Sequence, residues 1–352
     1  MSEEDAGMHR GVDSPAAPGC GSLPDDLLRE ILVRLPPEPS SLPRAAAVCK
    51  LWRRLVTDPK FFRLFCAHHR KPPLLGVFEY PGCNTVFRPI LDPPDRIPLE
   101  RFIRHGRLLD VRHGRVLAST RTQLSVCDPI TSQQVRVTIP PEIRRGYVVG
   151  AVLCAARDQG HVHGGCYSRP FKVVLVSMFR GDNLCIACVY SSETGIWGNL
   201  ISTKAPYRFR DVGKRPTLVG NTLYWLPMGD DILAFDMDEQ SLSVIEGPPF
   251  TSDGHIDNQI IHAEDGALGF VVLSYPHIQM WQRNVNCHGV AAWVPWKTIE
   301  MHSILGLPPQ IWHIGTQRQK LFTAVHYSDG SYAPDRSEPP MALVITRTQA
   351  AE

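Results

Sequence analysis

The sequence predicts a chain that is α+β by segments, with a small helical domain near the N-terminus and a much longer all-β domain after it. Two apolar stripes at helical spacing lie between Leu27 and Val56. From about Leu74 onward, short β-branched runs alternate instead with turn clusters such as YPGCN, LDPPD and FRGDN. The 31 prolines and 27 glycines agree with many tight turns between short strands.

The composition is that of a globular protein. It is 43% hydrophobic and 20% charged, and its net charge of +2 gives no support to nucleic acid as the main ligand. The N-terminal MSEEDAGMHR lacks the apolar core of a secretory signal, and the longest apolar run, at 147–156, is too short to cross a bilayer. Ten scattered cysteines are typical of buried thiols in a reducing compartment. We therefore expect a protein of the cytoplasm, the nucleus or both, with no membrane partner.

The helical domain is predicted to begin at Ser22, after a polar segment, 1–21, that we expect to be disordered. Ser22 is a good N-cap residue, and Pro24 is tolerated in the first turn of the helix that follows. PPEPSS at 36–41 ends this first helix.

A second helix is predicted from Ser41, and its apolar stripe extends to Val56. Asp58 and Pro59 end it, and KFFRLFCAHH then predicts a third short helix. We therefore expect a three-helix domain over 22–66. Residues 67–73, which include a proline pair, are the predicted linker.

The all-β part, residues 74–352, contains a weak internal repeat. Four segments each combine an apolar strand, a polar turn and a second strand; they begin at Leu124, Ile186, Ile232 and Ile278. The positions aligned among them, with spacings of 63, 45 and 46 residues, are Asp128, Ser191, Asp236 and Gln282. A period near 45 with several strands per copy is typical of a β-propeller, and the length allows about six blades.

The sequence does not decide whether the propeller ring closes. RQKLFTAVHY, at 318–327, could begin one more copy. The C-terminal stretch SYAPDRSEPPMALVITRTQAAE, however, shows no clear closing pair of strands.

The helical block contains two distinctive segments, LPDDLLREILVRLPP and VCKLWRRLVTDPKFF. They combine Leu-Pro, an acidic pair, a Leu/Ile-rich helix and a proline break with Val-Cys-Lys-x-Trp-Arg-x-Leu and Asp-Pro-x-Phe. In this pattern and spacing the block resembles the F-box family. Members of the family dock on the Skp adaptor of cullin–RING ubiquitin ligases.

The resemblance therefore implies a Skp-family adaptor as partner and, through it, a cullin. Helices this short carry more apolar side chains than they can bury among themselves, which also favours a partner surface. Some of these side chains are expected in the core and others in the interface, divided by helix face. The predicted adaptor-binding residues are Leu23, Pro24, Leu27, Leu28, Ile31, Leu32, Leu35, Pro36, Val48, Cys49, Trp52, Leu55 and Phe61.

The β-rich part is similar to the propeller-type F-box-associated region that is common in plant F-box proteins. RHGRVL, VCDPITSQQ, YSSETGIW and NTLYWL followed by ILAFD carry the similarity. In such proteins this domain holds the protein to be ubiquitinated, and other subunits perform the chemistry. The resemblance thus implies an unidentified target protein as second partner, with no catalytic residue, cofactor or metal in this chain.

Two rival functions stay open. One is a propeller scaffold that binds the adaptor without directing degradation. The other is a propeller hydrolase with an F-box-like helical cap, which would need paired carboxylates among Asp110, Asp128, Asp211, Asp236 and Asp238. Most of these residues lie beside Gly, Pro or Asn, as turn residues do, so the sequence favours a structural role for them.

Three further features each have a simple interpretation and a functional one. Cys185 and Cys188, with HVHGGC upstream, could bind zinc, but three-residue spacing in a strand puts side chains on opposite faces. The segment 44–71 has eight basic residues and one acidic residue, which fits a solvated helix face, attraction to an acidic adaptor or, less well, nucleic acid. Tryptophans in or beside strands are expected to pack between blades, and some could instead line a target-binding rim; they are Trp197, Trp225, Trp281, Trp293, Trp296 and Trp312.

Overall fold

The chain divides into two compact units, Met1–Arg70 and Lys71–Glu352. The structure is a computed structural model. It describes residues 24–69, 73–79, 86–101, 106–155, 166, 169–179, 183–204, 215–226, 231–249, 257–263, 265–274, 277–300 and 343–346. Within these residues, no helix is both long and apolar enough to cross a membrane.

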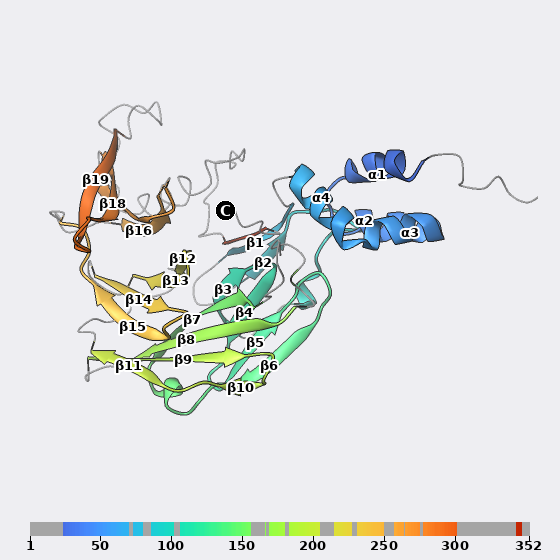
Figure 1. Ribbon diagram of the computed structural model, residues 1–352. Coiled ribbons are helices and arrows are strands. Elements are labelled where there is room, and N and C mark those ends of the chain that lie inside the picture. Colours follow the sequence, from blue (N-terminus) through green and yellow to red (C-terminus); the bar gives the residue numbers. More distant parts are fainter. Residues whose placement is uncertain are drawn as a thin grey trace, which may run out of the picture. The chain divides into compact units, whose positions relative to one another are not determined.

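The first unit is helical, as predicted, but it contains four helices where three were expected (Figure 1). They are α1 (Asp25–Val33), α2 (Ser41–Val48), α3 (Lys50–Thr57) and α4 (Pro59–His69). The predicted second helix is interrupted at Cys49, whose extended backbone (φ −159°, ψ 169°) breaks the hydrogen-bond ladder. The Cys49 sulfur accepts a hydrogen bond from the Trp52 N–H at 3.5 Å, so it caps the new helix α3.

The core of the helical unit takes side chains from all four helices. The fully buried ones are Leu28, Leu32, Val33, Ala45, Leu55, Val56, Phe61 and Phe65. α4 continues to His69, whose ring nitrogen Nε2 lies 3.0 Å from the carbonyl oxygen of Val33. The first three residues of the predicted linker therefore belong to a helix.

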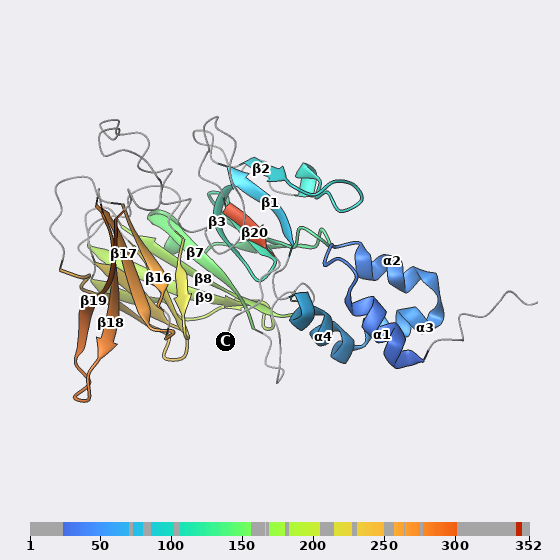
Figure 2. The ribbon, with the colours of Figure 1, turned by 90° about the horizontal axis from the view of Figure 1, so that it is seen from above.

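The second unit is all-β and consists of five antiparallel sheets in the described residues (Figures 1 and 2). Sheet A contains β1 (Leu74–Glu79), β2 (Val86–Pro89) and β20 (Leu343–Thr346). Sheet B contains β3 (Arg107–Arg112), β4 (Arg115–Ser119), β5 (Gln123–Cys127) and β6 (Gln134–Thr138). Sheet C contains β7 (Tyr147–Cys154), β8 (Phe171–Met178), β9 (Leu184–Ser191), β10 (Ile196–Trp197) and β11 (Ile201–Lys204).

The last two sheets repeat the four-stranded pattern of sheet B. Sheet D contains β12 (Thr217–Val219), β13 (Thr222–Trp225), β14 (Ile232–Asp236) and β15 (Ser241–Ile245). Sheet E contains β16 (Asp257–His262), β17 (Leu268–Ser274), β18 (His277–Val285) and β19 (Ala291–Glu300). Two short 3-10 helices, Leu99–Arg101 and Ile143–Arg145, lie in connections. Each four-stranded sheet is ordered as in the sequence, so it is a simple meander, as the repeat predicted.

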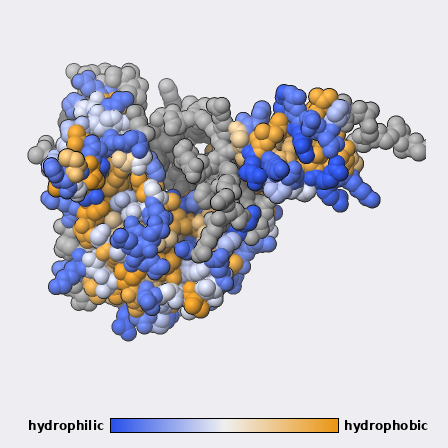
Figure 3. Space-filling model, in the orientation of Figure 1, coloured by the Kyte–Doolittle hydropathy of each residue, from blue (hydrophilic) through white to orange (hydrophobic). Residues whose placement is uncertain are grey.

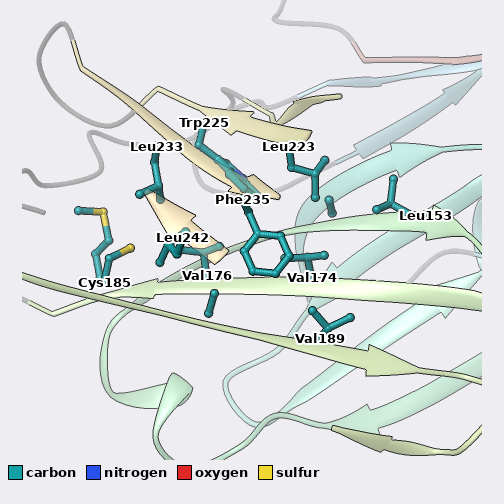
Figure 4. Close-up of a cluster of buried hydrophobic side chains, with 13 residues drawn as sticks. Leu153, Val174, Val176, Cys185, Val189, Leu223, Trp225, Leu233, Phe235 and Leu242 are labelled. Carbon is teal, nitrogen blue, oxygen red and sulfur yellow. The ribbon is translucent and has the colours of Figure 1, made fainter. Parts of the chain in front are cut away.

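Successive sheets bury their faces against one another, which is how the blades of a propeller stack. Leu75, Phe78 and Phe87 of sheet A pack with Leu108 and Val116 of sheet B. Another hydrophobic cluster lies between sheets B and C, and another between sheets D and E. Between sheets C and D, Phe235 and Leu223 lie opposite Val174 and Val176 (Figure 4).

Two tryptophans connect neighbouring blades through their ring nitrogens. The Nε1–H of Trp197 in sheet C donates to the carbonyl of Thr138 at the end of sheet B, at 2.9 Å. The Nε1–H of Trp293 in sheet E donates to the carbonyl of Glu246 after sheet D, at 2.8 Å. Packing between blades is thus confirmed for these two, and Trp225 lies in the core between sheets C and D. Trp312 lies outside the described residues.

The C-terminal stretch contributes a strand that the sequence did not reveal. β20 pairs antiparallel with β1, so sheet A joins the first and last strands among the described residues of the β unit. Residues 318–327, predicted as a possible further copy, lie outside the described residues.

Candidate adaptor-binding surface

The helical unit exposes large apolar side chains that its own core does not use. Leu27 and Ile31 on α1 are 47% and 48% exposed, and Val48 at the end of α2 is 60% exposed. Leu27 and Ile31 are four residues apart and therefore lie on one face of the helix. Figure 3 shows hydrophobic surface on this unit among hydrophilic residues. We call Leu27, Ile31 and Val48 the exposed apolar set.

The predicted adaptor-binding residues fall into distinct environments. The exposed ones are Pro24, Leu27, Ile31, Pro36 and Val48. Leu35, Cys49 and Trp52 are half-buried. Leu28, Leu32, Leu55 and Phe61 are buried. Leu23 lies outside the described residues.

Helix geometry explains this division. On α1, Leu28 and Leu32 follow Leu27 and Ile31 by one residue, or about 100° around the helix. They turn into the core, where neither is more than 2% exposed, so in this structure their side chains have no surface to offer a partner. Leu55 and Phe61 have the same environment, so these four are core residues. On α1 the buried and the exposed leucine and isoleucine side chains are thus divided by face, and adaptor binding by the exposed ones stays a prediction.

Leu64 is an exposed apolar residue that the sequence analysis missed. It lies on α4, and more than half of its side chain is open to solvent. Phe61 and Phe65, four residues apart, form the buried stripe of that helix, and Leu64 falls off it. Its position off the apolar stripe of the predicted helix could have identified Leu64 in the sequence as an exposed apolar residue.

Trp52 is the largest side chain at the border between core and surface. It packs against the helical core, and its ring nitrogen Nε1 is buried with no hydrogen-bond partner. A buried N–H without an acceptor costs about 1–3 kcal/mol. The indole ring of Trp52 therefore packs against the helical core, while its Nε1–H donates no hydrogen bond.

The surface around α2, α3 and α4 is basic. Arg54 pairs with Asp25 at 2.9 Å, and Arg29 lies 3.8 Å from Asp58. Other basic side chains of these helices are exposed, and the described residues show no acidic partner for them; they are Arg44, Lys50, Arg53, Lys60 and Arg63. The two exposed ion pairs add little stability. The five basic side chains without an acidic partner leave positive charge that can attract an acidic surface.

Asp110 and Asp128, two candidate carboxylates of the hydrolase hypothesis, bind backbone N–H groups. Asp110 is buried and accepts hydrogen bonds from the N–H groups of Val111 and Val152 at 2.9 and 3.1 Å. Asp128 accepts from the N–H of Ile130 at 2.7 Å, within the turn between β5 and β6. These contacts hold turns and neighbouring strands.

Asp236 plays the same part in sheet D. It accepts from the N–H groups of Glu239 and Asp238, both at 2.9 Å, in the turn between β14 and β15. The hydrogen bond from Glu239 lowers the pKa of Asp236 below its ordinary value. Asp238 is exposed in that turn, and Asp211 lies outside the described residues. The prediction that these are turn residues is confirmed for Asp128 and Asp236.

Cys185 and Cys188 cannot form half of a zinc site. Both are buried in β9, but Cys185 lies in the cluster between sheets C and D and Cys188 in the cluster between B and C. They therefore occupy opposite faces of one sheet, as their spacing predicted. Burial raises the pKa of both thiols to about 12. Of HVHGGC, only the buried Cys166 is among the described residues, which contain no group of three potential metal ligands.

Comparison with known proteins agrees with this division of the chain. Residues 21–64 match the F-box domain, which makes the helical unit an F-box. Residues 107–323 match the family described as "F-box protein AT5G49610-like, beta-propeller". The chain is thus an F-box protein with a C-terminal propeller domain. It belongs to this AT5G49610-like family.

The relatives are also F-box proteins. F-box protein At5g49610 of Arabidopsis thaliana is 25% identical over 86% of this chain and 86% of its own length. F-box protein At3g26010 of the same plant is 30% identical over 54% of this chain and 46% of its own length. The solved structure of Hsv2 from Kluyveromyces lactis matches 62% of this chain and 69% of its own, with 12% identity and a TM-score of 0.39.

Proposed function

We propose that this protein is the substrate-recognition subunit of an SCF-type (Skp–cullin–F-box) ubiquitin ligase. The exposed apolar set, Leu27, Ile31 and Val48, carries the proposal, because a monomeric helical unit gains nothing from leaving these side chains in water. They dock on a Skp-family adaptor, which connects the chain to a cullin. The basic surface of α2–α4 steers this association.

The β unit then holds the target protein. The mechanism is proximity: a target tied to the complex meets the ubiquitin-carrying enzyme at a high effective concentration. This chain itself contributes binding and no catalytic group. The ligase acts in the cytoplasm, the nucleus or both, where ubiquitin and the adaptor are present.

Co-purification with a Skp adaptor and a cullin tests the docking step. We expect the full-length protein to retain both partners. Leu27→Ala combined with Ile31→Ala should reduce adaptor capture about tenfold or more, because both side chains are exposed anchors. Trp52→Ala should also lose capture, with some loss of stability, because Trp52 is half-buried.

Ile196→Ala is the matched control, since this exposed apolar residue lies on the β unit. Its adaptor capture should equal that of the unmodified protein. Capture retained by a correctly folded Leu27→Ala/Ile31→Ala variant would refute docking through the exposed apolar set. Adaptor binding with no cullin and no ubiquitination of any bound protein would favour the scaffold function instead.

A further inference from the structure

Four arginines lie at one end of the neighbouring sheets B and C (Figure 1). Arg107 begins β3, and Arg121 lies in the turn between β4 and β5. Arg144 and Arg145 belong to the 3-10 helix that precedes β7. We call these four residues the arginine edge.

Backbone contacts bring the segments of the arginine edge together. Arg107 pairs with Ser119, and the turn that contains Arg121 begins directly after Ser119. The Thr122 carbonyl of that turn accepts a hydrogen bond from the Ile139 N–H at 3.0 Å. Ile139 begins the connection from β6 to β7, and this connection contains the 3-10 helix. The turn and the helix therefore meet at the same end of the two sheets.

The arginine edge is held in position. The Arg107 guanidinium lies 4.3 Å from the centre of the Tyr147 ring, a cation–π contact with the residue that begins β7. Tyr147 follows Arg145 by two residues. Ile143, in the same 3-10 helix as Arg145, is fully buried in the cluster between sheets B and C. Such a preorganised surface loses little conformational entropy when it binds a partner.

The charge of the arginine edge meets solvent and is not neutralised within the described residues. Arg121 and Arg145 are exposed, and Arg107 and Arg144 are half-buried. The ion pairs found among the described residues include none of the four. The exposed Glu142 is the acidic residue nearest to them in the chain, and it forms none of these pairs either. Since like charges repel one another, this arrangement does not benefit folding.

The geometry of arginine indicates the chemistry of the partner. A guanidinium is planar and always charged, and it binds a carboxylate through two parallel N–H bonds. The four guanidiniums come from a strand, a turn and a 3-10 helix, so they suit several carboxylates along a peptide better than a single phosphate. Nucleic acid fits less well, because Arg107 covers one face of the Tyr147 ring and leaves no stacking surface for a base on that face.

We propose that the arginine edge binds the target protein, and that it recognises an acidic segment of that protein, rich in Asp and Glu. This inference rests on the proposed function, because it assigns the target-binding role of the β unit to one end of sheets B and C. Complementary charge both steers the encounter and selects the partner. A phosphorylated segment and nucleic acid are outcomes of the test.

The first experiment places a photo-crosslinking amino acid, p-benzoylphenylalanine, at position 122 of the full-length chain in plant cells under proteasome inhibition. This exposed position is next to Arg121 and leaves all four arginines in place. We expect crosslinks to a ubiquitinated protein, in or beside a segment in which Asp and Glu outnumber Lys and Arg. The same probe at position 193, exposed in the turn at the other end of β9, should not crosslink to that protein.

The second experiment measures the affinity of the purified full-length chain for the crosslinked segment, made as an unphosphorylated synthetic peptide. Arg121→Glu combined with Arg145→Glu should weaken binding about tenfold or more at low salt, because attractive charges become repulsive. The difference should shrink as salt is raised, because salt screens exposed charges. A peptide with Asn and Gln in place of Asp and Glu should lose binding to the unmodified protein. The thermal midpoint of the double variant should stay unchanged, since both side chains are exposed.

Lys60→Glu combined with Arg63→Glu is the matched control. It makes the same change of charge at exposed positions of α4, in the helical unit. This variant should bind the peptide as the unmodified protein does, which separates the arginine edge from an effect of net charge.

Five outcomes would overturn the inference. They are unchanged affinity in the Arg121→Glu/Arg145→Glu variant, equal weakening in the α4 control, binding only by a phosphorylated form of the peptide, crosslinks only to segments without an acidic excess, and crosslinks only to nucleic acid. Adaptor capture, measured in parallel, keeps the two proposals separate. Loss of adaptor and cullin from the unmodified protein would refute the ligase function whatever the arginine edge does. Normal capture by the Arg121→Glu/Arg145→Glu variant with loss of the target supports both.

Discussion

At the scale of single residues, adjacent side chains have opposite roles. Leu27 and Leu28 are both leucines of one helix, yet the first is open to solvent and the second is in the core. The sequence predicted two roles divided by helix face, because helical spacing gives each side chain a fixed direction. It did not assign Leu28, Leu55 or Phe61 to the core, because that depends on how four short helices pack.

Buried thiols predict how stability changes with pH. The pKa of Cys185 and of Cys188 is about 12 in the folded protein, compared with 9.0 for a free thiol. Between these values the unfolded chain loses protons that the folded chain keeps, so stability is fully present below pH 9 and falls as pH rises. Each thiol should therefore lower the free energy of unfolding by about 1–2 kcal/mol between pH 8 and pH 10.

Denaturant unfolding at the two pH values measures this loss. A Cys185→Ala variant will be less stable at pH 8 but should lose less on going to pH 10 than the unmodified protein. The exposed Cys287 provides the control, since Cys287→Ala should leave the pH dependence unchanged. An identical pH dependence in Cys185→Ala would show that the thiol ionises equally in both states.

At the scale of elements, the sequence predicted which segments are helices and which are strands better than it predicted where each one ends. Helical periodicity continues through Cys49, so nothing in the pattern marked the break between α2 and α3. In sheet E, Gln282 was aligned with turn residues of other blades, but β18 continues to Val285 and the turn is at Asn286. Strand length and sulfur capping depend on tertiary contacts that periodicity does not record.

Gly146, directly before β7, lies so close to β8 that a larger residue should destabilise the pairing of these strands. A Cβ atom added to Gly146 would overlap the carbonyl of Met178 at the end of β8, although the backbone there (φ −108°) suits any residue. Gly146→Ala should therefore push β7 from β8 and cost about 1–3 kcal/mol of unfolding free energy.

Gly198→Ala is the matched control, because its Cβ would lie at an ordinary 3.4 Å from the Val189 carbonyl. It should change stability by about 0.5 kcal/mol or less. Calorimetry of the β unit compares the two variants. Equal thermal midpoints for Gly146→Ala and the unmodified protein would mean that the strands separate without cost.

At the scale of the whole molecule, the β unit depends on its C-terminal strand. β20 supplies one of the two partners of β1, through register pairs from Leu74 with Thr346 to Phe78 with Leu343. The repeat predicted blades but not this pairing, because the two strands are far apart in the chain and four residues carry little periodic signal.

Truncation tests this dependence. A chain ending at residue 342 lacks β20 and should lower the thermal midpoint of the β unit by at least about 4 °C, which corresponds to about 2 kcal/mol in hydrogen bonds. A chain ending at Thr346 retains β20 and should behave like the full chain. Equal midpoints for both truncations would show that β20 adds no stability.

The pairing of β1 with β20 has a consequence during synthesis. β1, at 74–79, leaves the ribosome long before its partner at 343–346 is made. At about 5–20 residues per second, β1 waits on the order of 13 to 54 seconds for that partner. Until then one edge of sheet A is open to wrong pairings, so premature termination leaves an unpaired strand edge that chaperones and proteases can recognise.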